Sequence, residues 1–178
     1  FAGKINLQAG SNFYTKEGSG GNDTAWTVIT RLGTDTDATT TPSSNSLQGL
    51  AYDNFSTGGI YANLSGKFVL GADIDASATS LYWDSGRGFI PIGGLSTGPF
   101  TGRFDGLGHR VTDLTINRTA DYQGLFAKVQ GSGTVRNLEL VDPNIMGNSY
   151  IGAVAGLLQN GTISNVAASG TAAYRSEE

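Results

Sequence analysis

Apolar and polar side chains alternate in short runs along this 178-residue chain, and glycine-rich turns separate the runs. Alternation with a period of two predicts half-buried strands rather than helices. In the first half of the chain, the runs that predict strands are 4–9, 25–30, 67–70 and 86–94. Only residues 47–55 carry apolar side chains at helical spacing, behind Ser46 or Asn45 as an N-cap. The pattern therefore predicts an all-β protein with one short helix.

A six-residue pattern recurs three times in the second half of the chain. Its template is apolar, polar, Asp or Asn, apolar, any residue, apolar, and its copies begin at residues 111, 135 and 163. A second echo matches residues 122–127 with 150–155. The copies lie 24 (135 − 111) and 28 (163 − 135) residues apart. Spacings of this size are typical of one coil of a parallel β-solenoid, in which each pass of the chain stacks on the previous one.

Stacking in register predicts columns of equivalent side chains along the solenoid axis. The expected columns are Val111 over Val135 over Ile163, Leu114 over Leu138 over Val166, and Asp113 over Asn137 over Asn165. The first two columns would form the apolar core. The third would be a polar ladder, because stacked Asn side chains hydrogen-bond to one another along the axis. We therefore interpret the recurring Asp/Asn position as structural rather than catalytic.

Composition narrows the class of protein. Charged residues make up 15% of the chain, against roughly 25% in an ordinary globular domain. The net charge of −4 argues against a nucleic-acid partner. Without cysteine, neither disulfides nor thiolate chemistry are available. The chain opens on Phe1, without an initiator Met or a signal peptide, so we expect an internal piece of a larger protein.

We expect one domain over residues 1–178, with a less regular N-terminal part at 1–99 and repeat coils at 100–174.

Several carboxylates and one histidine are candidate catalytic or metal-binding groups. Asp73 and Asp75 share a face but flank Ile74, which should be the buried residue, so we expect both to face solvent or to accept backbone hydrogen bonds. The other carboxylates near aromatic or turn positions are Asp84, Asp105 and Asp113. Asp35 and Asp37 lack the acidic residue that closes a calcium loop. We predict no catalytic residue, no metal and no cofactor.

His109 is the only histidine in the chain and lies in a glycine turn, so we interpret it as structural.

Aromatic side chains are the candidate binding residues. Tyr61, Tyr82, Trp83 and Tyr122 fall in expected loop regions, where a sugar ring can stack on an aromatic face. The alternative is that these side chains only cover the ends of the coils.

The motifs, taken in order, resemble a known family. They are LQGL at 47–50, LSGKFVLGADIDASAT at 64–79, GFIPIG at 88–93, FTGRFDGLGHRVTDLTIN at 100–117, DYQGLFAKVQGSGTVRNLELV at 121–141 and SYIGAVAGLLQNGTISNVAASG at 149–170. This series resembles the GLUG-motif region of filamentous-haemagglutinin-like exoproteins of Gram-negative bacteria, over about residues 26–174. One departure is Ala127-Lys128, where that family usually has another glycine.

The resemblance implies a right-handed parallel β-helix within a long secreted adhesin or biofilm-matrix protein at the bacterial cell surface. It further implies a two-partner-secretion transporter in the outer membrane and a host-cell, matrix or exopolysaccharide receptor. We expect a monomeric segment of a fibre, with no enzymatic activity. Two alternatives stay open. One is a carbohydrate-active β-helix enzyme, either a polysaccharide lyase or a glycosidase, and the other is a purely structural stalk spacer.

Overall fold

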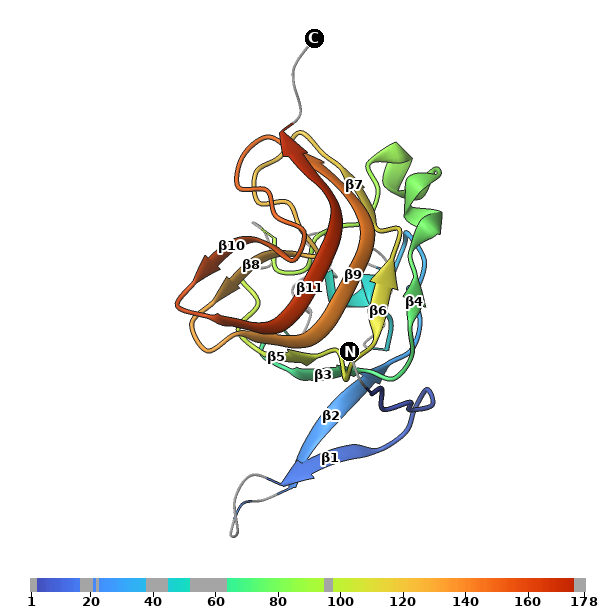
Figure 1. Ribbon diagram of the computed structural model, residues 1–178, viewed down its shortest axis with the longest axis vertical. Helices are drawn as coiled ribbons and strands as arrows, with labels where there is room; N and C mark the ends of the chain where they lie inside the picture. Colours follow the sequence, from blue (N-terminus) through green and yellow to red (C-terminus); the bar gives the residue numbers. More distant parts are fainter. Residues whose placement is uncertain are drawn as a thin grey trace.

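The computed structural model describes residues 3–16, 21, 23–37, 45–51, 64–94 and 98–174. Within these residues the protein is built mostly of β-strands with short 3-10 helices, and its main sheet curls around a core (Figure 1). The strands of that sheet follow the order β1-β2-β3-β5-β9-β6-β4, and β7 and β11 also pair with β9. Strands β8 and β10 form a separate two-stranded sheet. The expected all-β class is confirmed.

The elements follow one another along the chain with short connections. The strands are β1 (Phe13–Lys16), β2 (Asp23–Ile29), β3 (Lys67–Leu70), β4 (Ile74–Asp75), β5 (Arg103–Asp105), β6 (Arg110–Thr112), β7 (Thr115–Asn117), β8 (Phe126–Gln130), β9 (Thr134–Gly147), β10 (Ala155–Gln159) and β11 (Thr162–Tyr174). The 3-10 helices are η1 (Gln48–Ala51), η2 (Ser77–Ser80) and η3 (Trp83–Gly86).

Successive passes of the chain stack on one another as parallel strands. Among the named strands, only the β1–β2 pair is antiparallel. The long strand β9 pairs in turn with β5, β6 and β7 along one edge, and with β11 along the other. Figure 1 shows β9 and β11 running side by side around the curl. Three short strands of one pass thus lie against a single bent strand of the next.

Buried aromatic rings fill the inside of the curl. Phe100 and Phe126 are in contact with ring centroids 5.0 Å apart, and Phe104 meets Phe126 edge-on at 5.4 Å. Phe68 extends the group at 6.3 Å from Phe100. These side chains come from strands in consecutive passes and from the bridge at Phe100, and all of them are buried. Each pass therefore buries its apolar side against the next pass, as the repeat requires.

The predicted register is right for two copies of the repeat and wrong for the first. Val135 pairs with Ile163 and Leu138 pairs with Val166, as expected. However, Val111 pairs with Leu140, and the position over Val135 is filled by Phe104. The first apolar column therefore runs through Phe104 and not through Val111.

The cause of the register error lies in the corners of the curl. The Asp/Asn of the template adopts a left-handed backbone, with φ of 57° at Asp113 and 53° at Asn137. Asn and Asp tolerate this conformation better than other side chains. Each pass has more than one such corner. Thr112 pairs with Val141, so Asp113 and Asp142 (φ 50°) follow paired residues and mark a corner other than that of Asn137. One local template thus marks two different corners.

The polar ladder forms with a different first member. Asn165 Nδ2 donates to Asn137 Oδ1 at 2.7 Å, as stacking predicts. Asn137 Nδ2 in turn donates to Asp105 Oδ1 at 2.9 Å. Asp105 therefore takes the place expected for Asp113, which is exposed at another corner.

The first half of the chain departs further from expectation. Residues 4–9 form no strand, because Ile5 and Leu7 each donate a single backbone hydrogen bond, to Leu107 O and Gly71 O, across irregular segments. Strand β1 forms later and pairs antiparallel with β2. The strands expected at 25–30 and 67–70 are confirmed as β2 and β3. Residues 86–94 make only isolated bridges, since glycines with positive φ at 88 and 93 interrupt the extended backbone.

The predicted short helix is replaced by the single 3-10 turn η1. Ser46 caps it as expected, because its Oγ accepts the backbone N–H of Gly49 at 3.0 Å. Phe55, the last apolar residue of the predicted helix, lies outside the described residues. Within the part of the chain that the structure describes, no helix has the length and apolar character needed to cross a membrane.

Candidate functional site

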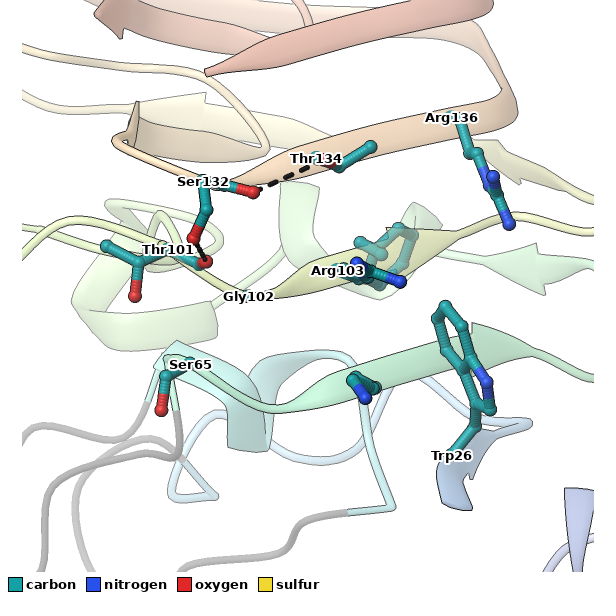
Figure 2. Close-up of a pocket in the computed structure, with 10 residues that line it drawn as sticks. Trp26, Ser65, Thr101, Gly102, Arg103, Ser132, Thr134 and Arg136 are labelled. Atoms are coloured by element: carbon teal, nitrogen blue, oxygen red, sulfur yellow. Dashed lines mark hydrogen bonds between the residues drawn. The ribbon is translucent and has the colours of Figure 1, made fainter. Parts of the chain in front are cut away.

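A polar pocket of about 440 Å³ opens on the outer face of the curled sheet, across β2, β3, β5 and β9 (Figure 2). Its lining residues are Trp26, Ser65, Lys67, Thr101, Gly102, Arg103, Phe104, Ser132, Thr134 and Arg136. The strand period of two explains how they reach this face. Phe68, Phe104 and Val135 point into the core, so the side chains of their neighbours along each strand point outward.

Equivalent residues of successive passes line up across the pocket. Lys67 pairs in register with Arg103, and Arg103 pairs with Thr134. A hydroxyl residue precedes each of Lys67, Arg103 and Thr134 by two positions. These hydroxyl residues are Ser65, Thr101 and Ser132. Figure 2 shows these three hydroxyl residues one above another at one end of the pocket. Since neighbouring strands lie about 4.8 Å apart, the pocket repeats a hydroxyl at each of three passes and places a cation beside it on the first two.

Backbone carbonyls orient the hydroxyls of the third pass that lines the pocket. Ser132 Oγ donates to Thr101 O at 3.1 Å, and Thr134 Oγ1 donates to Ser132 O at 3.3 Å. A hydroxyl that donates its proton in this way still carries acceptor lone pairs. The pocket thus presents fixed oxygen acceptors to a ligand.

Among the residues that the structure describes, three cations and no acidic side chain line the pocket, although the whole chain carries a net charge of −4. Lys67 Nζ donates to Thr24 Oγ1 at 3.3 Å. Arg136 Nε donates to Asp105 Oδ2 at 2.7 Å, while 48% of the Arg136 side chain stays exposed. The described part of the pocket lining is therefore basic, on a weakly acidic protein.

Asp105 is a buried support for this pocket rather than part of its lining. Besides Arg136, it accepts hydrogen bonds from the backbone N–H of Leu107 at 2.9 Å and from Asn137 Nδ2 at 2.9 Å. These contacts fix the carboxylate from two sides, so the guanidinium of Arg136 is held in one position. Asp105 therefore positions Arg136.

Trp26 forms the wall of the pocket at the β2 end. Its indole N–H donates to Thr15 Oγ1 at 2.8 Å, and its ring meets Phe13 edge-on with centroids 6.5 Å apart. Only 7% of the residue is exposed. Trp26 therefore shapes the pocket more than it offers a free stacking face.

Of the aromatic residues proposed from the sequence, the three that the structure describes do not line this pocket. Tyr82 is 92% exposed, whereas Trp83 is half-buried and donates its indole N–H to Gln48 Oε1 at 3.0 Å. Tyr122 stacks on Tyr150, with centroids 4.7 Å apart and 10° between the planes. Tyr61 lies outside the described residues.

Sequence reasoning missed both the stacked tyrosine and the pocket, although signals for each are present. Tyr150 is the counterpart of Tyr122 in the second echo, 28 residues on. For the pocket, the sequence signal is a recurring triplet of a hydroxyl residue, a glycine and a polar residue. Its copies are Ser65-Gly66-Lys67, Thr101-Gly102-Arg103 and Ser132-Gly133-Thr134. Only the fold shows that the triplets stack.

Asp73, a candidate catalytic carboxylate, is engaged in the scaffold. Asp73 accepts hydrogen bonds from Lys4 Nζ at 2.8 and 2.6 Å and from the backbone N–H of Arg110 at 3.2 Å. His109 Nδ1 lies 3.0 Å from Asp73 Oδ1, and its Nε2 lies 2.9 Å from Ile5 O. We call Lys4, Ile5, Asp73 and His109 the N-terminal clamp, because they tie the first described segment to the sheet.

Three further carboxylates, Asp75, Asp84 and Asp37, are also paired. Asp75 accepts the backbone N–H of Ser77 at 2.9 Å. Asp84 forms ion pairs with Arg87 and Arg118. Asp37 accepts hydrogen bonds from the hydroxyls of Thr34 at 2.6 Å and Ser46 at 2.7 Å.

The clamp gives the protein an acid-sensitive contact. Burial by itself would raise the pKa of Asp73, but hydrogen bonds from Lys4, His109 and the Arg110 backbone outweigh burial and lower this pKa from 3.8 to about 2. A lowered pKa in the folded state stabilises the protein above pH 3.8, and the contribution is lost as the pH falls through about 2. We expect Asp73→Asn to destabilise the protein most at neutral pH, with the difference shrinking below about pH 4. Urea unfolding from pH 7 to 2 measures this.

A matched variant tests the same contact from its other side. Lys4→Gln removes the first of the hydrogen-bonding partners that lower the pKa of Asp73, so the titration midpoint of that carboxyl, followed by NMR, should rise toward 3.8. An unchanged midpoint would contradict the clamp.

The described residues offer no metal site. Within them, no three or more His, Cys, Asp or Glu side chains lie in an arrangement that could hold a metal ion. Comparison with known proteins identifies a family nonetheless. Residues 44–170, well over half of the chain, match the family described as the M26 IgA1-specific metallo-endopeptidase N-terminal region. The chain belongs to this family. The matched unit is the N-terminal region of that family, and the donor groups among the described residues do not fit a metal ion.

Two relatives of this chain are longer proteins, and the chain covers only a small share of each. The chain is 44% identical over 107 residues to halomucin of Haloquadratum walsbyi, covering 60% of this chain and 1% of halomucin. It is 40% identical over 103 residues to a protein described as a Gly-rich membrane protein of Evansella cellulosilytica, covering 56% of this chain and 12% of that protein. No solved structure matches the chain significantly.

The family match corrects the resemblance inferred from the motifs. The chain belongs to the M26 N-terminal region and not to the GLUG-motif region of filamentous-haemagglutinin-like exoproteins. The physical reason is that glycine turns, alternating strands and left-handed Asx corners serve any stack of short parallel strands. Such features identify a kind of scaffold rather than one family. The expectations of two-partner secretion and of a Gram-negative source rested on that resemblance, and the comparisons give them no support.

Proposed function

We propose that this chain is a surface-exposed segment of a large extracellular protein and that it attaches that protein to surfaces, cells or exopolysaccharide. The size of the relatives supports this, since the chain spans only 1% and 12% of the two proteins it matches. The second relative is described as a membrane protein. A location at the cell surface or outside the cell follows from the proposal.

The scaffold we propose is a right-handed parallel β-helix. Parallel passes in register and left-handed corners repeated at equivalent positions support it. The helix would present flat outer faces of short strands to a partner. An experimental structure reads the handedness directly, and an open or left-handed arrangement would contradict this part of the proposal.

The pocket across β2, β3, β5 and β9 is the observation that carries an attachment function. A pure spacer needs only a packed core and a soluble surface. Here, four consecutive strands of the outer face combine into a cavity of about 440 Å³ lined by cations and hydroxyls. Ligand sites are concave and hold a few convergent polar groups.

We propose no catalytic role for the segment. Retaining and inverting glycosidases need two carboxyl groups that flank the scissile bond, whereas Asp73 and Asp75 are engaged by the N-terminal clamp and by Ser77. The lining residues that the structure describes include no carboxylate. The partner would be a surface receptor or exopolysaccharide rather than a nucleic acid, and the segment would act as a monomer.

A binding screen with the isolated chain tests this proposal. We expect saturable binding to at least one polysaccharide, extracellular-matrix or cell-surface preparation on an array, and no binding by the heat-denatured chain. Reducing-sugar release from the same polysaccharides is measured in parallel. Absence of binding to every surface would favour the spacer, and turnover lost in Asp73→Asn or Asp75→Asn would favour an enzyme.

A further inference from the structure

We infer that the pocket across β2, β3, β5 and β9 binds a polysaccharide that carries carboxylate or sulfate groups, an inference that rests on the proposed attachment function. The ligand would lie across successive strands, with its anionic groups against Lys67 and Arg103 and its hydroxyls against the hydroxyl residues beside them.

The register of two cations is the first argument. Lys67 and Arg103 are direct partners on the adjacent parallel strands β3 and β5 and point to the same outer face. Neighbouring strands lie about 4.8 Å apart, so the two cationic side chains can reach anionic groups of one extended ligand on this face.

The third cation is already held for recognition. Arg136 gives its Nε–H to the buried carboxylate of Asp105, which Leu107 N and Asn137 Nδ2 hold in place. Arginine has five N–H donors in a planar fork that matches carboxylate and sulfate-like oxygens. A guanidinium fixed in this way loses less freedom when it binds an anion.

The hydroxyl column selects a sugar polymer over a simple anion. Ser65, Thr101 and Ser132 repeat at the strand spacing of about 4.8 Å, and two of the three passes place a cation two residues further along the strand. A ligand with recurring hydroxyl and anionic groups satisfies this arrangement at several points. A single phosphate or chloride ion would use only the cations.

The position of the pocket disfavours an acidic peptide. Extended peptides bind sheets by adding a strand at an exposed edge, where the main chain supplies the hydrogen bonds. The pocket lies instead on the face of β3 and β5, whose backbone groups already pair with neighbouring strands on both sides. Only side chains are available to a ligand here.

Matched polymers test the inference with the isolated chain. Titration calorimetry with polygalacturonate, and with dextran sulfate, should show binding that weakens as salt rises, because ion pairs at an exposed site are screened. Methyl-esterified polygalacturonate and plain dextran, which lack the charges, should bind at least tenfold more weakly. Comparison of the two anionic polymers separates carboxylate from sulfate as the preferred group.

Variants locate the site. Arg103→Gln should weaken binding of the preferred anionic polymer about tenfold or more, which is the size of effect expected for a charge-assisted contact. Arg87→Gln, an equal charge change on an exposed arginine that directly follows η3, should leave binding unchanged. Arg103 is exposed, so the Arg103→Gln variant should unfold at the temperature of the parent within a few degrees. A folded variant with lost binding supports the site.

Several outcomes overturn the inference without overturning attachment. Equal binding of charged and uncharged polymers, or equal losses in Arg103→Gln and Arg87→Gln, would contradict an anion-selective pocket while leaving a binding function in place. Poly-L-glutamate that binds as tightly as polygalacturonate, with the same dependence on Arg103, would assign the pocket to acidic peptides. Failure to bind any polymer, matrix or cell surface would overturn the proposed function as well.

Discussion

Phe126→Ala is expected to lower the free energy of unfolding by about 3–5 kcal/mol, the usual cost of removing a buried phenyl ring. Phe126 is fully buried and contacts the rings of Phe100 and Phe104, at centroid distances of 5.0 and 5.4 Å. These rings come from different passes, so the cavity would open between coils rather than inside one. Since domains of this kind are stable by only about 5–15 kcal/mol, the loss should be seen directly in urea unfolding.

An exposed apolar residue supplies the control for Phe126. Leu158 is in β10 and is 46% exposed. Leu158→Ala should change the free energy of unfolding by less than about 0.5 kcal/mol. A loss below about 1 kcal/mol for Phe126→Ala would mean that the aromatic group does not hold the passes together.

Asp105→Ala is expected to cost about 2–3 kcal/mol, because it leaves three donors without their acceptor. Those donors are the Leu107 backbone N–H, Asn137 Nδ2 and Arg136 Nε. Asp113→Gly is the matched control: it also removes a carboxylate, while glycine tolerates the left-handed backbone at this position. The control should change stability by no more than about 0.5 kcal/mol.

This pair of variants decides between two registers. The repeat template in the sequence places Asp113 in the ladder with Asn137 and Asn165, whereas the fold places Asp105 there. A larger loss for Asp113→Gly than for Asp105→Ala in chemical denaturation would contradict the register of the structure. Because Asp105 also positions Arg136, the Asp105→Ala variant should weaken polysaccharide binding as well.

Asp105, the acceptor at the end of the polar ladder, shows why the sequence alone predicted the wrong register for the first copy of the repeat. Phe104 and Asp105 precede the first recognisable copy of the template, and nothing in FDGLG announces that it is equivalent to VRNLE. The equivalence follows from pairing, in which Phe104 meets Val135 and Asp105 meets Arg136. A large ring and a smaller aliphatic group occupy one column because the core around them compensates for the difference in volume, and that compensation is not a local property.

Local physics did determine a large part of the fold. The period of two fixed the β class and placed β2 and β3, because alternation is a property of the extended backbone itself. The hydroxyl of Ser46 as a cap followed from the orphan N–H groups at the start of any helical turn. The recurrence of copies 28 residues apart fixed which segments of β9 and β11 stack.

The tertiary structure decided what lies far apart in the sequence. His109 meets Ile5 across 104 positions, and the pocket joins Trp26 to Arg136 across four strands. A sequence pattern reports which side of its own strand a residue faces. It does not report which other strand lies beside it, since that depends on how all passes fill the core together. The scaffold could therefore be anticipated from its repeats, while the binding pocket and the clamp emerged only from the packing of one pass on the next.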